Sequence, residues 1–360
     1  AGEGRIARRT ALTVGALVLL RLVVAAVTPL AFDEAYYWTW SRSLAGGYYD
    51  HPPMVAYVIR AGTLIAGDTE LGVRLVSILL ALPMSFAIWR SAEILFGGVR
   101  VAAAATILLN VTLMAAVGTL IVTPDAPLLV ASTFVLFFLA KVLEAGRGAW
   151  WLAVGAAAGC ALLSKYTAMF FGVAILIWLV AVPKLRHWLL SPWLWLGGLV
   201  ALALFAPVIL WNADHHWVSF IKQMGRARIA DFRPAFIAEL VPTQVAFATP
   251  LVFILGAMGL HAMAWSKSGA YAARMLINAM FWTIVGYFAW HSLHARVEAN
   301  WFAPVYPAFA IAAAVAAHLA PWEGRRKRLA DFCTRWAAPS AIVLFALLIV
   351  QANTGMLTGY

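Results

Sequence analysis

The sequence predicts an all-α polytopic membrane protein, as composition, the order of apolar segments and the distribution of charge all indicate. Hydrophobic residues make up 64% of the 360 residues and charged residues only 11%, whereas soluble domains have roughly 45–50% and 25%. One membrane-spanning helix needs about 20 apolar residues, so this composition suffices for about eleven transmembrane helices. Too few apolar residues would remain for a water-soluble core.

Apolar segments along the chain predict the helices, beginning with one that follows Arg5, Arg8 and Arg9. This first segment is longer than the hydrophobic region of a signal peptide, and no cleavage site of small residues follows it. We therefore expect it to be retained, and residues 1–360 to form a single membrane domain. The predicted spans are 10–31, 73–95, 99–121, 124–142, 149–163, 167–183, 192–211, 240–264, 275–291, 301–320 and 337–352.

Charge predicts the orientation of these spans. Counting the N-terminal Arg5, Arg8 and Arg9, about 16 of the 26 Lys and Arg residues fall on one side, in the alternate connections at 90–100, 141–147, 184–186, 267–274 and 325–335. Cytoplasmic loops carry such an excess of positive charge. We therefore expect a bacterial inner-membrane protein with a cytoplasmic N-terminus and a periplasmic active site. These loops also account for the net charge of +11, and no long basic tail or zinc-finger spacing indicates nucleic acid.

Two outer connections are long, and both interleave aromatic with charged residues. They are the first outer loop, residues 32–72, and the fourth, residues 212–239. Such stretches favour amphipathic helices that lie in the membrane interface with their rings at headgroup level. We interpret 32–72 as the catalytic loop and 212–239 as a basic loop within the same domain.

Three outer carboxylates are the candidate catalytic groups. Asp33 and Glu34 follow directly on the first span, where adjacent carboxylates must be solvated, paired or held for catalysis. Asp125 stands at the outer start of a later span. Carboxylates that converge on one cavity suit general-base catalysis or the orientation of a nucleophilic hydroxyl. Each can equally be a helix N-cap, and the residues alone leave that alternative open.

Polar residues in two further outer segments are candidates for substrate binding. Asp50 and His51 precede two prolines that stiffen the backbone, and the pair is read as a substrate contact, a turn or a pair of metal ligands. Lys165, followed by Tyr166, is a lone cation at the outer boundary. It either snorkels along the apolar surface or binds a phosphate.

The fourth outer loop is basic on the face where positive charge is usually sparse. This predicts an anionic partner, and a lipid phosphate is the natural one at that depth. His215 and His216 leave a divalent metal open, although adjacent helical residues do not face one way; no other cofactor is indicated. The cations of this loop are Lys222, Arg226, Arg228 and Arg233.

Three polar residues before the tenth span either complete the site or anchor that helix end: His294, Arg296 and Asn300.

Together these residues resemble the C superfamily of polyprenyl-phosphate-sugar-dependent glycosyltransferases, in particular the bacterial relatives of protein O-mannosyltransferases and of the lipid A aminoarabinose transferase. The resemblance implies that Asp33 is the catalytic base and that Asp125 helps to form the cavity. It also implies that Lys165, Arg226 and Arg228 bind the carrier phosphate. The motifs that carry it are Phe32-Asp33-Glu34, Tyr48-Tyr49-Asp50-His51-Pro52-Pro53, Thr123-Pro124-Asp125, Ser164-Lys165-Tyr166 and the later Asn300-Trp301, Pro304 and Tyr306-Pro307.

The resemblance implies transfer of a sugar from a polyprenyl-phosphate donor. If the reaction is a single displacement, it inverts the anomeric centre of the sugar. The acceptor would be lipid A or its core, another glycan, or a protein, and membrane lipids would be further partners. The rival hypothesis is a lipid or solute transporter, which predicts inverted repeats and ionisable residues at mid-membrane. We find no repeat, and only Arg21 lies within a span in that manner.

Overall fold

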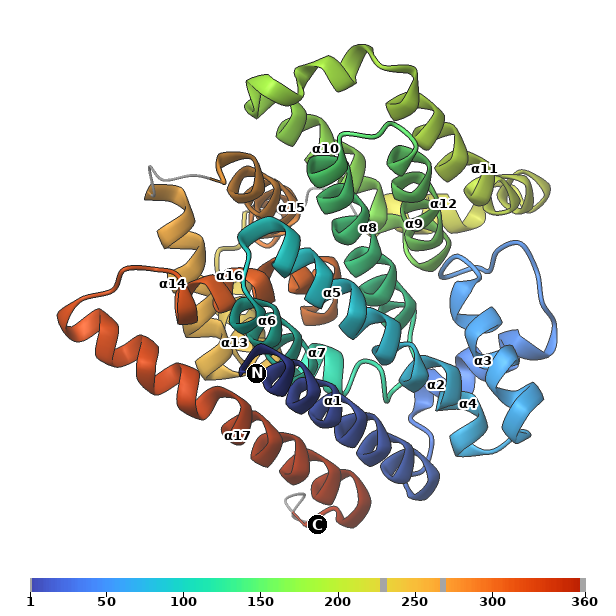
Figure 1. The fold of residues 1–360 in the computed structure, drawn as a ribbon. Coiled ribbons are helices and arrows are strands. Elements are labelled where there is room, and N and C mark those ends of the chain that lie inside the picture. Colours follow the sequence, from blue (N-terminus) through green and yellow to red (C-terminus); the bar gives the residue numbers. More distant parts are fainter. Residues whose placement is uncertain (1, 227–231, 266–269, 357–360) are drawn as a thin grey trace.

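A computed structural model describes residues 2–226, 232–265 and 270–356, and the secondary structure in this part of the chain is entirely helical (Figure 1). The first half contains α1 (Gly2–Val27), α2 (Phe32–Arg42), α3 (Met54–Ala66), α4 (Glu70–Leu79), α5 (Ala81–Phe96), α6 (Val99–Val111), α7 (Leu113–Ala116), α8 (Asp125–Ala145), α9 (Trp150–Ser164) and the short 3₁₀ helix η1 (Tyr166–Met169). The second half contains α10 (Phe170–Ala181), η2 (Pro183–Leu190), α11 (Pro192–Asp214), α12 (Val218–Arg226), α13 (Ala235–Ala248), α14 (Pro250–Trp265), α15 (Tyr271–His291), η3 (Ala299–Val305), α16 (Tyr306–His318) and α17 (Gly324–Thr354).

The predicted polytopic membrane architecture is confirmed, but the count of eleven spans is not. Among the described residues, seven helical stretches are long and apolar enough to cross a membrane. An eighth crossing results if α13 and α14, which meet at an angle of 103°, are taken together. The other three predicted spans, at 99–121, 149–163 and 167–183, correspond to shorter apolar helices.

The predicted span 99–121 is divided because its backbone changes direction at Thr112. α6 ends at Val111, and the Thr112 hydroxyl accepts a hydrogen bond from the Ala115 amide and so caps α7. Arg21 belongs to α1 and is buried, and its guanidinium donates to the Asn110 carbonyl at 2.6 Å. A cation at a helix C-terminus satisfies an orphan carbonyl and complements the helix dipole. Apolar composition alone does not reveal such a break.

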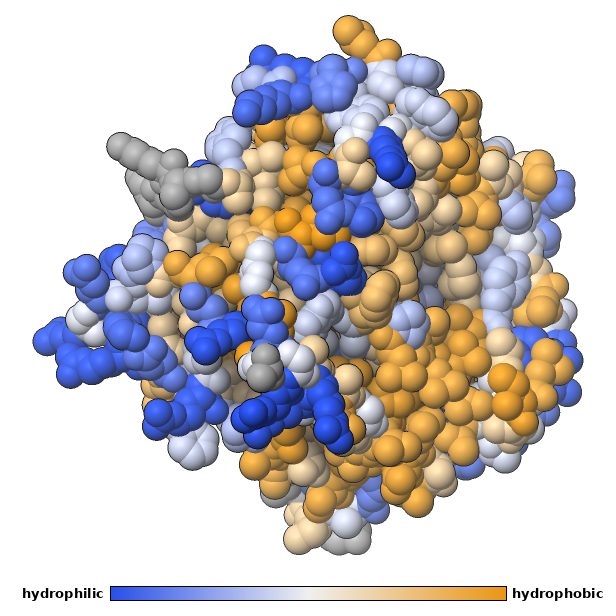
Figure 2. Space-filling model, in the orientation of Figure 1, coloured by the Kyte–Doolittle hydropathy of each residue, from blue (hydrophilic) through white to orange (hydrophobic). Residues whose placement is uncertain are grey.

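α1 and α17 run side by side along one edge of the molecule (Figure 1), and Asn353 binds Thr28 where the two helices end. Figure 2 shows hydrophilic residues gathered over the beginning of α17 and a broad hydrophobic surface over the lower right of the same face. An extensive exposed apolar surface is what a lipid-facing helix bundle presents, whereas soluble monomers keep such patches small.

Close packing of α9 against α11 brings together two parts of the site. A Cβ on Gly155 would lie only 2.0 Å from the Gly197 carbonyl oxygen, so glycine is required for this approach. α9 ends at Ser164, just before Lys165, and α11 leads into α12. The contact between α9 and α11 therefore places Lys165 and α12 on the same side of the bundle. Both long outer loops contain helices, as predicted: α2 and α3 in the first, α12 in the other.

Candidate active site

A buried ion pair fixes the start of α2. Glu34 is 0% exposed, and both of its oxygens accept hydrogen bonds from Arg74, at 2.7 and 2.5 Å. The amides of Ala31 and Val122 also donate to this carboxylate, at 2.9 and 3.2 Å. Bidentate Arg–carboxylate pairs are strong and geometrically specific. The Glu34 carboxylate is therefore fully engaged inside the protein.

Arg74 also binds the end of α1. Its guanidinium donates to the carbonyls of Ala25, Thr28 and Pro29, at 3.1, 2.6 and 2.9 Å. These carbonyls lie at a helix C-terminus, where they have no intrahelical partner. Sequence reasoning missed Arg74, although a lone Arg at the edge of the predicted span 73–95 is the signal that could have indicated it.

Asp33 differs sharply from its neighbour. Its side chain is exposed, and it makes no hydrogen bond or ion pair with any residue that the structure describes. Its charge acts on Tyr37, one helical turn further along α2: the pKa of Tyr37 is raised first by burial and then by the charges of Asp33, Asp125 and Asp50. Three carboxylates from separate segments thus act electrostatically on one phenol.

Asp125 joins two residues that are distant in the sequence. Its Oδ1 accepts from the Lys165 ammonium at 2.7 Å, and its Oδ2 accepts from the Asn300 amide at 2.6 Å. Asp125 and Lys165 are both buried, with side chains 4% and 8% exposed. The structure therefore unites three predicted site residues, but it gives the charge of Lys165 a partner within the protein.

Asp50 holds α12 against the first outer loop. Its carboxylate accepts from the Tyr36 hydroxyl at 2.6 Å and forms an ion pair with Lys222, while the Gln223 amide donates to the Asp50 carbonyl at 2.7 Å. Burial favours a raised pKa of Asp50, but the hydrogen bonds from Lys222 and Tyr36 outweigh it and lower the pKa. The Lys222 ammonium also lies over the Tyr49 ring, 4.2 Å from its centroid.

His51 sits among cations with one ring nitrogen unused. Its Nδ1 is buried and has no hydrogen-bond partner among the described residues. Burial, followed by the charges of Lys165, Arg226 and Lys222, lowers the pKa of His51 to about 3, while Asp50 acts in the opposite sense. His51 is therefore neutral at pH 7. Positive charge from two segments, Lys165 and α12, therefore acts on His51.

Of the remaining predicted substrate contacts, some lie at the site and others do not. Tyr166 belongs to the site, since its hydroxyl lies 2.7 Å from the Ser219 hydroxyl and its ring packs on Phe220 of α12. Arg226 closes α12 and is near enough to act on His51. Arg228 lies outside the described residues.

His294 and Arg296 are engaged elsewhere. Arg296 forms an exposed ion pair with Glu239 at 2.7 Å, and the His294 ring packs near Trp290, whose carbonyl lies 3.2 Å from its Nδ1.

The two predicted histidines lie directly after the end of α11. The His215 ring stacks on Trp211, and His216 has a positive φ of 55°. Within residues 2–226, 232–265 and 270–356, no group of three His, Cys, Asp or Glu side chains could hold a metal ion.

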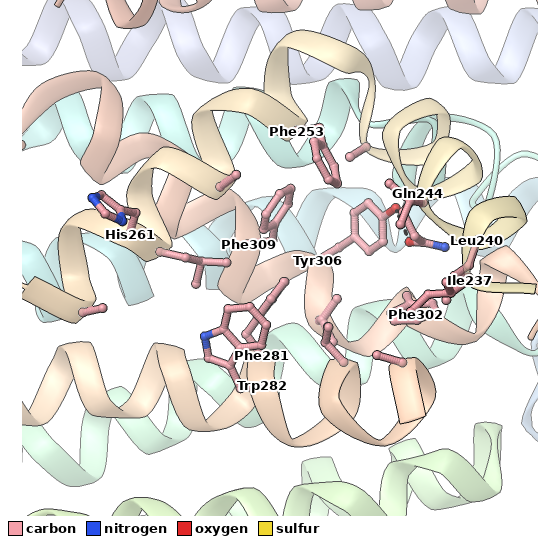
Figure 3. A pocket seen from close by; sticks show the side chains of 18 residues that line it. Ile237, Leu240, Gln244, Phe253, His261, Phe281, Trp282, Phe302, Tyr306 and Phe309 are labelled. Atoms are coloured by element: carbon pink, nitrogen blue, oxygen red, sulfur yellow. Dashed lines mark hydrogen bonds between the residues drawn. The ribbon is translucent and has the colours of Figure 1, made fainter. Parts of the chain in front are cut away.

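An apolar cavity of about 520 Å³ adjoins the site. It lies among α13, α14, α15, η3 and α16, and Figure 3 shows the rings of Phe253, Phe309 and Tyr306 gathered on it. At one end the Tyr306 hydroxyl donates to Gln244 at 3.4 Å, and Gln244 donates to the carbonyl of Ala299, next to Asn300. Sequence reasoning missed this cavity, although the aromatic residues from 302 to 309 are a signal that could have indicated it.

Fold and site together define a polytopic membrane protein with a polar site beside an apolar cavity. The family model for dolichyl-phosphate-mannose-protein mannosyltransferases matches residues 50–211. The chain is also 25% identical, over 327 residues, to the lipid A galacturonosyltransferase RgtD of Rhizobium johnstonii. That match covers 83% of this chain and 64% of the relative, so the chain spans less than two thirds of the relative's length.

Solved structures share the fold. ArnT from Cupriavidus metallidurans bound to undecaprenyl phosphate superposes with a TM-score of 0.72 at 20% identity, covering 96% of this chain and 71% of that one. The archaeal oligosaccharyltransferase AglB from Archaeoglobus fulgidus, in complex with an inhibitory peptide and a dolichol-phosphate, gives 0.55 at 13% identity, covering 94% and 56%. The predicted resemblance is confirmed, because the family model, the relative and the solved structures all show similarity to the C superfamily of membrane glycosyltransferases.

Proposed function

We propose that this protein transfers a sugar from a polyprenyl-phosphate donor to a lipid A-like acceptor, with Asp33 as general base. The observation that carries the proposal is the state of the outer carboxylates. Glu34, Asp50 and Asp125 each bind a cation of the protein, whereas Asp33 is exposed and makes no such contact with the described residues. A base must be able to reach the proton that it removes.

The reaction follows from this arrangement. Asp33 accepts the proton of the acceptor hydroxyl as its oxygen attacks the anomeric carbon of the donor. The bond from that carbon to the phosphate oxygen breaks, and the carrier phosphate leaves with the electron pair. A single displacement of this kind inverts the anomeric centre. Positioned cations stabilise the negative charge that develops on the leaving group.

The cations around His51 are the proposed phosphate ligands. Arg226 and Lys165 both act on the His51 ring, and Arg228 keeps the role that the sequence predicts for it. Lys165 already pairs with Asp125, so we assign it two roles. It holds Asp125 in place, and it presents its remaining donors toward the phosphate. An ammonium group has three donors, so one lysine can fill both roles.

The relatives support a lipid substrate, since one acts on lipid A and another was solved with undecaprenyl phosphate. The apolar cavity beside η3 suits a lipid chain. The comparisons give no support to the transporter alternative. We place the site on the periplasmic side of a bacterial inner membrane, with a cytoplasmic N-terminus, because the basic connections lie on the opposite face.

The test is Asp33→Asn, which removes the base and keeps nearly the same volume. We expect transfer to fall by roughly 10²–10⁴-fold, the usual contribution of general-base catalysis, while thermal stability stays unchanged. Products are measured by mass spectrometry after incubation with extracted polyprenyl-phosphate sugars and lipid A. Asp68→Asn is the matched control, because Asp68 pairs with Arg42 in the same outer loop. Near-normal turnover in a folded Asp33→Asn protein would contradict the assignment.

A further inference from the structure

A second crevice lies at the opposite end of the molecule from the candidate active site. α16 begins at Tyr306, directly after η3 and Asn300, and ends at His318. Thirteen helical residues span about 20 Å, so His318 is remote from the proposed chemistry. The crevice there has a volume of about 280 Å³ and lies among α1, α6, α14, α16 and α17, with Arg100 and His318 among its lining residues.

The crevice is amphipathic. Arg100 and His318 are its exposed polar groups, and neither forms an ion pair or hydrogen bond with a described residue. Thr334 of α17 is the third polar group, but its hydroxyl already binds the Ala330 carbonyl. The remaining lining is apolar and comprises Ile6, Ala103, Ala104, Ile107, Leu108, Leu255, Ala317 and Ala338. A positive mouth over an apolar floor matches a ligand that is anionic at one end and apolar at the other.

The helix that forms one wall of the crevice indicates where such a ligand comes from. The first turns of α17 carry Arg325, Arg326, Lys327 and Arg328, of which Lys327 pairs with Asp331. Basic clusters beside a membrane span attract anionic lipids, at about 1 kcal/mol per Lys or Arg near the surface.

The same stretch of α17 also exposes an apolar stripe, formed by Leu329, Phe332 and Trp336, which are 43%, 53% and 49% exposed. Aromatic residues of this kind are enriched at headgroup level. The mouth of the crevice is thus placed where lipid phosphates lie.

We propose that this crevice binds an anionic glycerophospholipid of the leaflet opposite the active site. Its phosphate lies at Arg100 and His318, and an acyl chain follows the apolar floor between α6 and α17. The lipid neutralises a cation that forms no ion pair with the described residues, and it fills the gap between α1, α6, α16 and α17. It therefore stabilises the bundle without taking part in the reaction.

The test titrates the purified protein in neutral detergent with phosphatidylglycerol, phosphatidylcholine or inorganic phosphate. Bound lipid is counted by native mass spectrometry, and thermal unfolding is followed in parallel. We expect phosphatidylglycerol to be retained and to raise the unfolding temperature, while the other two ligands have little effect. Arg100→Gln should weaken apparent affinity by about tenfold, as expected for the loss of one charge-assisted contact.

Arg147→Gln is the matched control, since Arg147 is an exposed cation between α8 and α9 that does not line the crevice. It removes the same charge and should bind phosphatidylglycerol like the wild type. Ala338→Phe, which obstructs the apolar floor, should weaken binding independently of charge. Equal loss in Arg100→Gln and Arg147→Gln would overturn the proposal in favour of general surface attraction. Equal stabilisation by phosphate or phosphatidylcholine would overturn it as well.

Discussion

Asp33 and Glu34 are neighbours in the sequence, but their side chains meet opposite surroundings. Consecutive residues of a helix point about 100° apart. Glu34 consequently faces the junction of α1 and α4, where Arg74 binds it, while Asp33 faces outward. The sequence predicts both as catalytic groups. The contacts of Glu34 instead suit a positioning residue that holds the first turn of α2, and with it Asp33, in place.

Glu34→Gln should therefore act chiefly on stability. The substitution keeps the volume but leaves the buried Arg74 without a counter-charge, and breaking such a pair is destabilising by about 3–5 kcal/mol. We expect a clear fall in the unfolding temperature, measured by differential scanning fluorimetry, with transfer reduced only in proportion to the folded fraction. Asp33→Asn supplies the contrast, with full stability and lost transfer. A stable but inactive Glu34→Gln protein would show that Glu34 takes part in the chemistry.

Part of this residue-scale arrangement can be predicted from the sequence. It identifies Asp125, Lys165 and Asn300 as site residues, because polar groups at the outer ends of apolar spans share one face. Their mutual contacts cannot be predicted, since they depend on how α8, α9 and η3 pack. Arg74 is visible as a lone Arg at the edge of a predicted span, but that position suits a snorkelling Arg as well as a buried one, so its pairing with Glu34 cannot be predicted.

Among the elements, α12 is the helix that brings positive charge to the site. Three contacts hold it on the first outer loop: the ion pair of Lys222 with Asp50, the bond from Gln223 to the Asp50 carbonyl, and the position of Lys222 over Tyr49. The charge of Arg226, the last residue of α12, acts on His51 in this docked arrangement.

Lys222→Gln should weaken that docking and so act on donor binding. The pair is partly exposed, with side chains 26% and 17% accessible, so we expect its loss to correspond to about 1 kcal/mol. The apparent KM for the donor should then rise by about fivefold, with little change in kcat. Steady-state kinetics at varied donor concentration measures both constants. Lys141→Gln, which breaks a pair with Glu144 on α8, is the control. A fall in kcat at unchanged KM would assign Lys222 to the chemical step instead.

At this scale, hydrophobicity predicts where helices run better than where they end. The long spans are predictable because their apolar runs are uninterrupted. The predicted span 99–121 is divided at the Thr112 cap, and 167–183 begins with the 3₁₀ helix η1 before α10. The predicted span 149–163 coincides with α9, but its 15 residues are fewer than the roughly 20 that a crossing needs. A bundle that buries these ends can satisfy their backbone groups internally, so short helices are tolerated at membrane depth.

In the molecule as a whole, the polar site and the apolar cavity meet at η3. Asn300 of η3 binds Asp125, whereas Phe302 and Val305 of the same short helix line the cavity. A substrate that places its reactive group at Asp33 can therefore place a lipid chain among α13, α14, α15 and α16. The helices α13 and α14, which meet at 103°, border this space. In the sequence, only Pro250 marks the bend between them.

Narrowing the cavity should thus discriminate between substrates by chain length. Ala257 lines the cavity and is exposed to it, so Ala257→Phe fills space that a lipid chain would use. Displacing about two methylene groups, at about 0.8 kcal/mol each, lowers kcat/KM for long-chain substrates by roughly tenfold. Donors with short prenyl chains and deacylated acceptors should react as well as with the wild type.

Comparing long and short versions of the donor and of the acceptor, one substrate at a time, shows which of the two occupies the cavity. Ala203→Phe, on the exposed surface of α11, controls for the added ring. If Ala257→Phe slows long and short substrates equally, the cavity is part of the structural core of the bundle and takes no substrate chain.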